Sequence, residues 1–320
     1  MRRSRQEQAF VQYIWDWFSR HKRTLPWRDL KIEDDTQRAY MILVSEVMLQ
    51  QTQVSRVEVI FTRFLREFPA IHDLAKASNK DVIIAWRGMG YNSRALRLRD
   101  AAKTIVDQHK GIFSKEYDQL IAIKGIGPYT AAAVRNFAFN LPTPCIDTNI
   151  RRILHRVFIG PENEDGEFET KDKELLKLAD AVLKVALAQP NAGTTADWHA
   201  ALMDFGSAVC TKANTQYQMF PLAKNRMKKQ VVAVQAKKKK IKKQEPGRFV
   251  GSVFIPNRIF RGRIVETLRD AHRGMTLEDI GSIITLDWAD EHQSWLASLL
   301  SALEKDGMIK KFRNVYKLHE

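Results

Sequence analysis

Residues 120–131 decide the fold, and they read Leu-Ile-Ala-Ile-Lys-Gly-Ile-Gly-Pro-Tyr-Thr-Ala. Apolar residues flank a Gly-x-Gly turn on both sides, which predicts a helix, a tight turn and a second helix. Gly125 and Gly127 allow positive φ and close approach to the backbone, and Pro128 suits the first position of the second helix. The N–H groups that this helix leaves free form a local anion site, which suits one DNA phosphate. An ordinary helix–helix turn has the same spacing, so both interpretations stay open at this point.

The charge of the whole chain favours a polyanionic partner. The 320 residues include 52 Lys and Arg against 37 Asp and Glu, for a formal net charge of +15, which suits nucleic acid or an acidic membrane surface. The longest apolar run, residues 40–44, is too short to span a bilayer, and the basic start leads into no signal-type apolar core. Two cysteines supply neither a disulfide framework nor a four-thiolate metal site. We therefore expect a cytosolic nucleic-acid protein with no membrane segment.

Helical spacing dominates the chain to about residue 220, and the composition changes abruptly after it. Apolar residues recur at three- and four-residue intervals over residues 10–18, 41–65, 80–86 and 93–109, with no hairpin or alternating-strand signal. Residues 224–248 carry eleven basic side chains against one acidic side chain. Like-charge repulsion in such a segment predicts a solvated tether.

The end of the chain predicts a winged helix. Residues 261–268, 276–284 and 294–304 have helical spacing, and Thr276 with Asp279 three residues later predicts the N-cap of the second helix. A basic, alternating end follows and predicts a β-ribbon. Three short helices and such a ribbon outline a winged helix, a domain that binds either DNA or another protein.

Two carboxylates stand in unusual surroundings. Glu46 lies within one turn of Leu43, Val47 and Leu49, so one of its flanks borders apolar surface. An ionised carboxylate is costly there, and a carboxyl held neutral suits a general acid. The alternative is a Glu on the water-facing edge of an amphipathic helix. Asp147 opens a helical run as its expected N-cap, a role that is compatible with presenting a carboxylate oxygen to a pocket.

Five further segments follow in order along the chain, with the glycine turn between the third and the fourth. They are Leu-Pro-Trp-Arg at 25–28, Ser-Glu-Val-Met-Leu-Gln-Gln-Thr-Gln at 45–53, Trp-Arg-Gly-Met-Gly-Tyr at 86–91, Ile-Asp-Thr-Asn at 146–149 and Leu-Met-Asp-Phe-Gly at 202–206. Together they resemble the helix-hairpin-helix DNA glycosylases, and specifically the MutY-type adenine DNA glycosylases, over residues 8–220. The string at 45–53 is the most specific, because sister families in the fold differ there.

The resemblance implies a mainly α, two-lobed helix-hairpin-helix glycosylase fold followed by a small winged-helix-like α+β domain. The expected parts are a glycosylase domain over 1–222 with lobes 29–140 and 1–28 plus 141–222, a Lys-rich linker over 223–250 and the winged-helix-like domain over 251–320. We expect a monomer bound to duplex DNA near a bacterial nucleoid. In a eukaryote, the Lys-rich run would be a nuclear localisation signal instead.

By resemblance, the chain flips adenine mispaired with 8-oxoguanine or guanine out of the duplex and hydrolyses its N-glycosidic bond. Glu46 would protonate the adenine at N7 and help to activate water, and Asp147 would stabilise the oxocarbenium-like sugar. Tyr129 stands where bifunctional relatives carry a lysine that forms a Schiff base with the sugar. A phenol cannot do so, and we therefore expect no strong strand cleavage.

The other site residues also follow from the resemblance. Gln51 and Tyr91 align with residues that wedge into the base stack. Trp27, Arg28 and Leu49 align with walls of the base pocket. The remaining DNA-binding positions are the two turn glycines, Gly125 and Gly127, and Asn149, which aligns with a hydrogen-bonding residue of the active site.

The sequence departs from the family at its cofactor and at its C-terminal module. Most members hold an iron–sulfur cluster through four cysteines. Only Cys210 is kept, and Tyr217, Phe220 and Arg226 stand at the other positions, so we expect no cofactor and a buried Cys210 thiol. The winged helix replaces the NUDIX-like module that senses 8-oxoguanine, which leaves recognition of the partner base open.

Three smaller departures touch the site. Ala200 stands where members have Gln or Glu to read the adenine edge, and His199 or Trp198 is a candidate substitute. Asn92 replaces the second Tyr of a frequent Tyr-Tyr pair, and Thr148 replaces a frequent Gly.

Two alternative functions stay open. A thymine (T:G mismatch) or oxidised-pyrimidine glycosylase has the same fold, and thymine glycosylases also carry Tyr at position 129. The full match at 45–53 argues against them. A winged-helix DNA-binding regulator with a decayed glycosylase body is the other alternative, against which the intact Glu46, Asp147 and Tyr129 argue.

Overall fold

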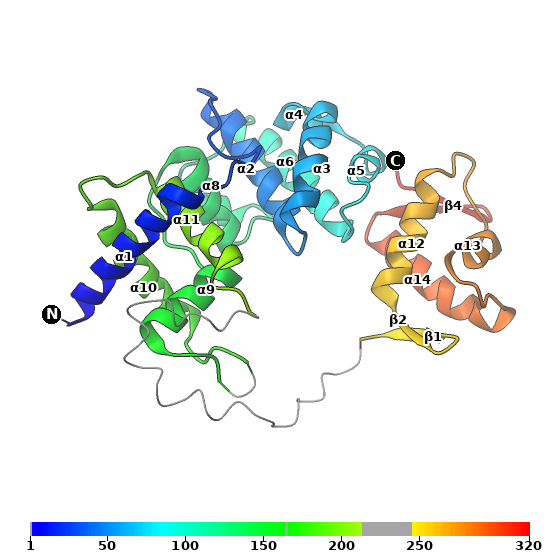
Figure 1. Ribbon diagram of the computed structural model, residues 1–320. Coiled ribbons are helices and arrows are strands. Elements are labelled where there is room, and N and C mark those ends of the chain that lie inside the picture. The colour runs from blue at the N-terminus through cyan, green and yellow to red at the C-terminus, as the bar shows by residue number, and fades with distance from the viewer. Residues whose placement is uncertain (1, 164–165, 213–244) are drawn as a thin grey trace. The chain divides into compact units, whose positions relative to one another are not determined.

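The structure, a computed structural model, describes residues 2–163, 166–212 and 245–320 (Figure 1). Its described part is mainly helical, and two short antiparallel ribbons lie near the C-terminal end. The predicted mainly α class with a small α+β end is therefore confirmed. The chain divides into two compact units, Met1–Ile42 with Ser114–Ala122 and Ile126–Lys242, and Leu43–Phe113 with Ile123–Gly125 and Lys243–Glu320. This division falls elsewhere than the predicted lobes, since the second helix of the glycine hairpin joins the core of the first unit.

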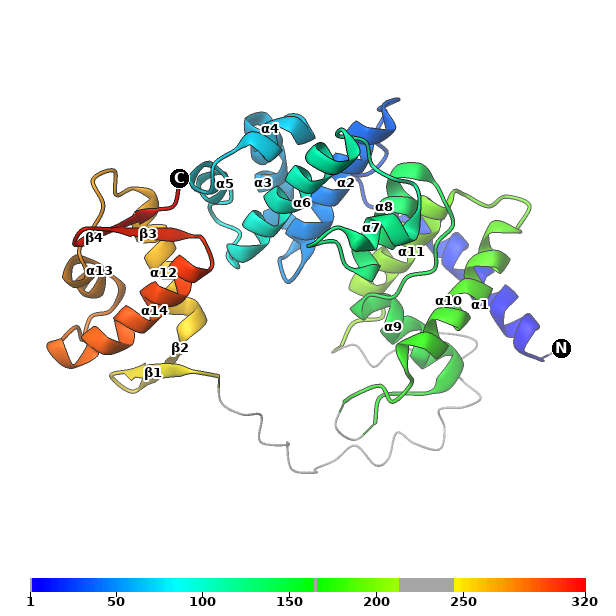
Figure 2. The same ribbon diagram turned by 180° about the vertical axis from the view of Figure 1, so that it is seen from behind.

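The first unit surrounds an aromatic core. Its helices are α1 (Arg2–His21), the start of α2 (Asp35–Leu49), α7 (Tyr117–Ala122), α8 (Pro128–Phe139), α9 (Thr148–Leu154), the π-helix η1 (His155–Ile159), α10 (Asp172–Leu187) and α11 (Thr195–Ala208). Figure 2 shows α1 beside α10, and α1 also packs against α11. Phe10 of α1 meets Phe158 edge-to-face with ring centroids 5.3 Å apart, and Trp17 meets Phe205 in the same way at 5.3 Å. Such pairs stabilise the core beyond their apolar area.

The helical part of the second unit begins with the end of α2. It continues through α3 (Val54–Glu67), α4 (Ile71–Lys76), α5 (Asn79–Ala85) and α6 (Ser93–His109). The helical pattern over 41–65 is therefore two helices, interrupted at residues 50–53, where Gln51 has a left-handed φ of +56°. These four residues are all polar, so no apolar side chain continues the buried stripe across the break.

The C-terminal part of the second unit has the outline of a winged helix. Its elements are β1 (Gly247–Val250), β2 (Val253–Pro256), α12 (Asn257–Arg269), α13 (Leu277–Ile284), the 3-10 turn η5 (Asp290–His292), α14 (Gln293–Lys305), β3 (Ile309–Phe312) and β4 (Val315–Leu318). The predicted cap of α13 is present, because the Asp279 N–H donates to Thr276 Oγ1 at 3.1 Å. The ribbon pairs Ile309 with Leu318 and Phe312 with Val315.

The predicted boundary at residue 250 was placed too late. Strand β1 lies inside the predicted linker and pairs with β2 in an antiparallel hairpin that the sequence analysis missed. A signal was available, because Gly251 and Ser252 form a two-residue turn between two apolar runs, and Gly251 has a φ of +57°. The linker segment 223–244 lies outside the described residues.

The C-terminal helices share a core with α5 and α6. Phe260 and Ile264 of α12 pack with Leu296 of α14, and Ile83 and Leu96 belong to the same buried cluster. The winged-helix part is thus packed against helices of the second unit through apolar contacts. Across the described residues, no helix is long and apolar enough to cross a membrane.

Candidate active site

The glycine hairpin joins α7 to α8 as predicted. Gly125 has a φ of +101°, and a Cβ there would lie 3.1 Å from the carbonyl oxygen of Arg97, so a side chain is unfavourable on two grounds. Gly127 is different, since it has a φ of −88° and caps α8 in an extended conformation. Of the two glycines, which both allow a positive φ, Gly125 adopts one and Gly127 does not. Open space around Gly127 leaves room for a ligand at the first N–H groups of α8.

Asp147 caps α9, as the local sequence predicts. Its Oδ1 accepts the Ile150 N–H at 2.6 Å. Burial raises the pKa of the Asp147 carboxyl, and the backbone N–H groups of Ile150 and Asn149 oppose this shift. A carboxylate with little water around it gains more from a nearby cation than an exposed one does. Asp147 is therefore suited to stabilise positive charge that develops close to it.

Glu46 is buried in α2, with 6% of its surface exposed. All residues of this helix from 42 to 48 are buried, so the helix has no water-facing edge in this stretch. The alternative of a solvent-facing Glu46 is thus wrong. Leu49 ends the same helix and is half-buried.

Tyr129 is the second residue of α8, immediately after the capping glycine and Pro128. Its ring is partly buried and packs against the core of the first unit. The position at the hairpin therefore presents a phenol.

Trp27 and Arg28 line a cavity of about 340 Å³ in the first unit, together with Ala200. Leu49, the third predicted pocket wall, is not among the residues that line this cavity. Arg28 makes a bidentate ion pair, with Nη1 2.7 Å from Asp204 Oδ2 and Nη2 2.8 Å from Asp204 Oδ1. The Asp204 carboxylate therefore fixes the orientation of the Arg28 guanidinium beside the cavity.

Asp204 is a residue whose role the sequence analysis missed. It is 1% exposed, and Arg23 joins Arg28 on its two oxygens. Burial alone would raise the pKa of the Asp204 carboxyl, but the two arginines together hold it below its usual range. The available signal was an Asp between apolar neighbours in the Leu-Met-Asp-Phe-Gly segment.

The suggested substitutes for the adenine-edge reader do not reach this cavity. His199 is 2% exposed, and its Nδ1 donates to the Thr195 carbonyl at 2.8 Å. Burial lowers the pKa of His199 to about 4, so the ring is neutral near pH 7. Trp198 is buried in the core with its ring centroid 6.2 Å from that of Phe10. Neither residue lines the cavity that Ala200 lines.

Asn149 is fixed on α9 by a neighbour one turn away. Its Oδ1 accepts from Arg152 Nη2 at 2.6 Å, which orients the amide. A side chain at Gly206 would meet the Asn149 Cβ at 2.6 Å, so a glycine is needed where α11 crosses α9. The predicted site segments 146–149 and 202–206 are thus in contact.

Gln51 and Tyr91 occupy two neighbouring loops of the second unit and line one cavity. Both have left-handed backbones, with φ of +56° and +45°, and Tyr91 is 47% exposed. Such strain in non-glycine residues is common where a side chain has a binding role. The two predicted wedge residues therefore project from strained loops.

Arg94, which the sequence analysis missed, makes hydrogen bonds to both of these loops. Its Nη1 donates to the carbonyls of Val47 and Met48 at 3.0 Å each, and its Nη2 donates to Thr52 Oγ1 at 3.0 Å. The guanidinium also lies 5.6 Å from the ring centroid of Tyr91. Burial lowers the pKa of Arg94 to about 10, which still leaves it charged at neutral pH. Arg94 thus satisfies carbonyls at the end of α2 while it supports Tyr91.

The donor set does not fit the iron–sulfur cluster of the family. The whole chain has two cysteines, Cys145 and Cys210, and both are buried. Arg156 Nη1 lies 3.6 Å from the Cys210 Sγ, and burial raises the pKa of that thiol. The buried thiol predicted at Cys210 is therefore confirmed, whereas the other three positions, 217, 220 and 226, lie outside the described residues. In the described ranges, no three His, Cys, Asp or Glu side chains are placed to hold a metal ion.

Comparison with known proteins identifies the family. Residues 44–199 match the HhH-GPD superfamily of base excision DNA repair proteins. The chain is 30% identical over 295 residues to the adenine DNA glycosylase of Mycolicibacterium smegmatis, a match that covers 92% of this chain and 90% of that enzyme. This chain belongs to the adenine DNA glycosylases. It is also 38% identical over 207 residues to the mouse adenine DNA glycosylase, with coverage of 63% of this chain and 38% of the mouse enzyme.

Solved structures support the same fold. A thermostable thymine-DNA glycosylase matches with a TM-score of 0.56 and 23% identity, covering 66% of this chain and 90% of that one. Endonuclease III in a non-covalent DNA complex matches with a TM-score of 0.50 and 18% identity, covering 66% and 89%. The predicted helix-hairpin-helix glycosylase fold is confirmed. The Mycolicibacterium smegmatis match is long enough to take in much of the C-terminal part of this adenine glycosylase.

Proposed function

We propose that this adenine DNA glycosylase hydrolyses the N-glycosidic bond of adenine opposite 8-oxoguanine or guanine and does not cleave the strand. The observation that carries the proposal is the burial of Glu46, at the family's acid position, in a stretch of helix that has no exposed face. Burial away from water favours the neutral form of a carboxyl group. A neutral carboxyl is what protonation of a leaving group requires.

The proposed reaction uses Glu46 twice. The Glu46 carboxyl donates its proton to N7 of the flipped adenine, and the bond between C1′ and N9 breaks with its electron pair going to the base. The resulting sugar cation is stabilised by the carboxylate of Asp147, which is half-buried at the start of α9. The Glu46 carboxylate then takes a proton from water as the water oxygen bonds to C1′. The products are free adenine and an abasic site.

Tyr129 supports the monofunctional part of the proposal. Strand cleavage by a Schiff-base route needs an amine that attacks C1′. The hairpin position presents a phenol, which forms no imine. The abasic product should therefore stay intact on the strand until another agent cleaves it.

The glycine hairpin supports DNA binding. Gly127 leaves the N–H groups at the start of α8 accessible, and α8 has twelve residues, long enough for a substantial dipole. A DNA phosphate held there would position the duplex without reading its sequence. Gln51 and Tyr91, on their strained loops, would fill the space that the flipped nucleotide leaves.

The proposal includes no cofactor, because hydrolysis by two carboxylates and water needs none and two cysteines cannot hold a four-thiolate cluster. It places the enzyme as a monomer on DNA, at the nucleoid of a bacterium or in the nucleus of a eukaryote.

A base-release panel tests the proposal. Duplexes with A:8-oxoguanine, A:G, T:G and an oxidised pyrimidine should give free adenine from the first two and no base from the others. Alkali should be needed to break the product strand. Faster release of thymine or a damaged pyrimidine would support the alternative glycosylase instead, and sequence-specific binding with no base release on any duplex would support the regulator.

A further inference from the structure

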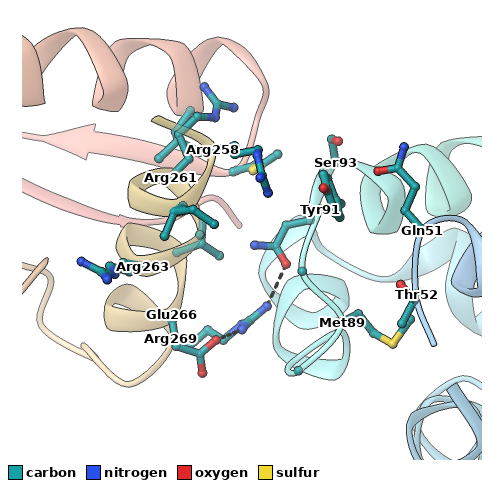
Figure 3. Close-up of a pocket in the computed structure, with 18 of the residues that line it drawn as sticks. Gln51, Thr52, Met89, Tyr91, Ser93, Arg258, Arg261, Arg263, Glu266 and Arg269 are labelled. Carbon is teal, nitrogen blue, oxygen red and sulfur yellow. Dashed lines mark hydrogen bonds and ion pairs between the residues drawn. The ribbon is translucent and has the colours of Figure 1, made fainter. Parts of the chain in front are cut away.

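The second unit contains a cavity of about 710 Å³ that the glycosylase chemistry does not use. One wall consists of the loops that carry Gln51 and Tyr91, and the other is formed largely by α12 of the winged-helix part (Figure 3). The lining includes the basic side chains of Arg56, Arg258 and Arg261. The predicted wedge residues therefore share a cavity with arginines of the C-terminal part.

The α12 wall is fixed to the helical part by a buried arginine. Arg269 Nη2 donates to Asn92 Oδ1 at 3.0 Å, and Arg269 Nε donates to the Ile83 carbonyl at 3.1 Å. Both Arg269 and Asn92 are buried. Asn92 is one of the positions at which this chain departs from its family, and the structure gives the departure a role, because the amide receives the arginine.

Two polar contacts at the surface add to this docking. Asn79 Nδ2 donates to the Gly307 carbonyl at 2.7 Å, and Arg87 Nη2 lies 2.6 Å from Asp270 Oδ1. Together with the shared apolar cluster around Ile83, they fix α12 relative to the loop that carries Tyr91. The cavity is thus bounded by packed elements on both sides.

The helices that a winged helix ordinarily presents to DNA carry few of the basic residues that DNA binding requires. The second helix, α13, has no basic residue and carries Glu278 and Asp279 in its first turn. The third helix, α14, has one basic residue, Lys305, at its last position. Helices that read the major groove need cations and hydrogen-bond donors along their exposed face. Neither helix supplies such a face.

The cations of α12 are better placed. Arg258 is exposed at the start of the helix and reaches toward the loop of Tyr91 (Figure 3). Its Nε lies 3.0 Å from Glu245 Oε2, and Arg261 pairs with Asp306. The carboxylate of Glu245 raises the pKa of Arg258, and the nearby Tyr91 hydroxyl adds to the shift. The Arg258 pair is exposed and the Arg261 pair is partly exposed. Ion pairs in contact with solvent contribute little free energy, so a phosphate can displace the carboxylates.

We propose that Arg258 and Arg261 of α12 bind the sugar–phosphate backbone of the substrate duplex beside Gln51 and Tyr91, in place of the usual recognition helix. The inference rests on the proposed function for the choice of DNA as substrate. It gives the C-terminal part a defined role, which is to extend the DNA-binding surface next to the wedge. The contact is with phosphates, so it adds affinity without reading sequence.

The test compares two double variants of the full chain that lose the same charge. R258A/R261A removes the two cations from the cavity wall. K310A/K311A removes two exposed cations from strand β3, which does not line the cavity. The dissociation constant for an A:8-oxoguanine duplex is measured across a salt series for both variants and the wild type. Thermal unfolding of each protein checks that the fold is kept, and R258Q alone serves as a milder variant.

For R258A/R261A, the plot of log K against log salt should be less steep than for the wild type. The magnitude of its negative slope should fall by roughly 1.8, because each lost phosphate contact removes roughly 0.9. The K310A/K311A protein should keep the wild-type slope. Equal slopes for R258A/R261A and wild type, or an equal loss in both double variants, would overturn the proposal. Base release is measured in a separate assay. A wild type that releases no adenine would contradict the proposed function, whereas the salt slopes would still show whether Arg258 and Arg261 contact DNA phosphates.

Discussion

At the residue scale, ion pairs with the buried Asp204 hold Arg28 beside the cavity of the first unit. Asp204 accepts two hydrogen bonds from the Arg28 guanidinium and two from Arg23, one from its backbone N–H and one from its Nε. Removing the charge of Asp204 leaves both arginines without their counter-ion, and the Arg28 side chain is only 9% exposed. Asp204 is thus a positioning residue, since it acts on the cavity by orienting Arg28, which lines it.

The first prediction concerns this cluster. Asp204→Asn should lower the free energy of unfolding by about 3 kcal/mol, because two guanidinium groups lose their buried counter-ion. Urea denaturation gives the value. Asp180→Asn is the matched control, since Asp180 makes an exposed pair with Lys184 and its loss should cost under about 0.5 kcal/mol. Similar losses in both variants would contradict the assignment.

The second prediction is a pH dependence set by His199. The pKa of His199 is lowered to about 4 in the folded protein, whereas an unfolded histidine titrates near ~6.5. Between these values the unfolded chain binds a proton that the folded chain does not. The contribution of neutral His199 to the free energy of unfolding should therefore be fully present above about pH 6.5. It should fall as the pH drops toward 4, by up to about 1.4 kcal/mol per pH unit.

Denaturation of the wild type and of His199→Gln between pH 4.5 and 6.5 measures this contribution. The substituted protein should show a shallower loss of stability over that interval, because Gln does not titrate. Two parallel stability curves would show that His199 is not the group responsible.

At the element scale, the glycine hairpin gives a matched pair of substitutions. Gly125→Ala places a methyl group 3.1 Å from the Arg97 carbonyl at a φ of +101° and should cost about 1–3 kcal/mol of stability. Gly127→Ala enters open space at an ordinary φ and should leave stability nearly unchanged. The measurement is thermal unfolding of both proteins alongside duplex binding.

Gly127→Ala should nonetheless weaken duplex binding, because the methyl group occupies the approach to the N–H groups of α8. Full affinity in this stable variant would show that no phosphate is held there.

The elements that local sequence determines were predicted well. The cap of α9 by Asp147 and the cap of α13 by Thr276 depend on residues within three positions, which a sequence shows directly. The range of α6 also agrees with its apolar spacing. The break between α2 and α3 at residues 50–53 was not predicted. Apolar residues with helical spacing lie on both sides of these four polar residues, so the sequence is also compatible with one continuous helix.

The support of the site was harder to predict, because its partners are far apart in the chain. Arg94 binds carbonyls more than forty positions away, and Arg269 binds Asn92 from another part of the chain. Nothing in the local pattern around either arginine indicates its acceptor. The partners of Asp204, Arg23 and Arg28, are likewise 181 and 176 positions away in the chain.

At the scale of the whole molecule, this adenine DNA glycosylase carries a part with a winged-helix outline. That part is docked on α5 and α6 through Arg269 and an apolar cluster, and the whole chain has two cysteines. A base hydrolysis that needs two carboxylates and water requires neither a four-thiolate cluster nor a lesion-sensing module. Both features are thus compatible with the proposed reaction.

The fourth prediction follows from the cysteine content. Purified protein should contain no stoichiometric iron or acid-labile sulfide, and dialysis against a strong chelator should leave the melting temperature and base release unchanged. Cys210→Ala should keep the activity of the wild type, with a stability loss of about 1–2 kcal/mol from its buried site. Stoichiometric iron, or loss of folding on chelation, would contradict this.

Single-turnover base release from an A:8-oxoguanine duplex tests whether buried Glu46 protonates the departing adenine. Glu46→Gln should bind the duplex yet release adenine ~10²–10⁴-fold more slowly, because the amide has no proton to give. Glu67→Gln, at an exposed position on α3, should match the wild type. A Glu46→Gln protein that binds DNA and releases adenine at the wild-type rate would contradict the claim.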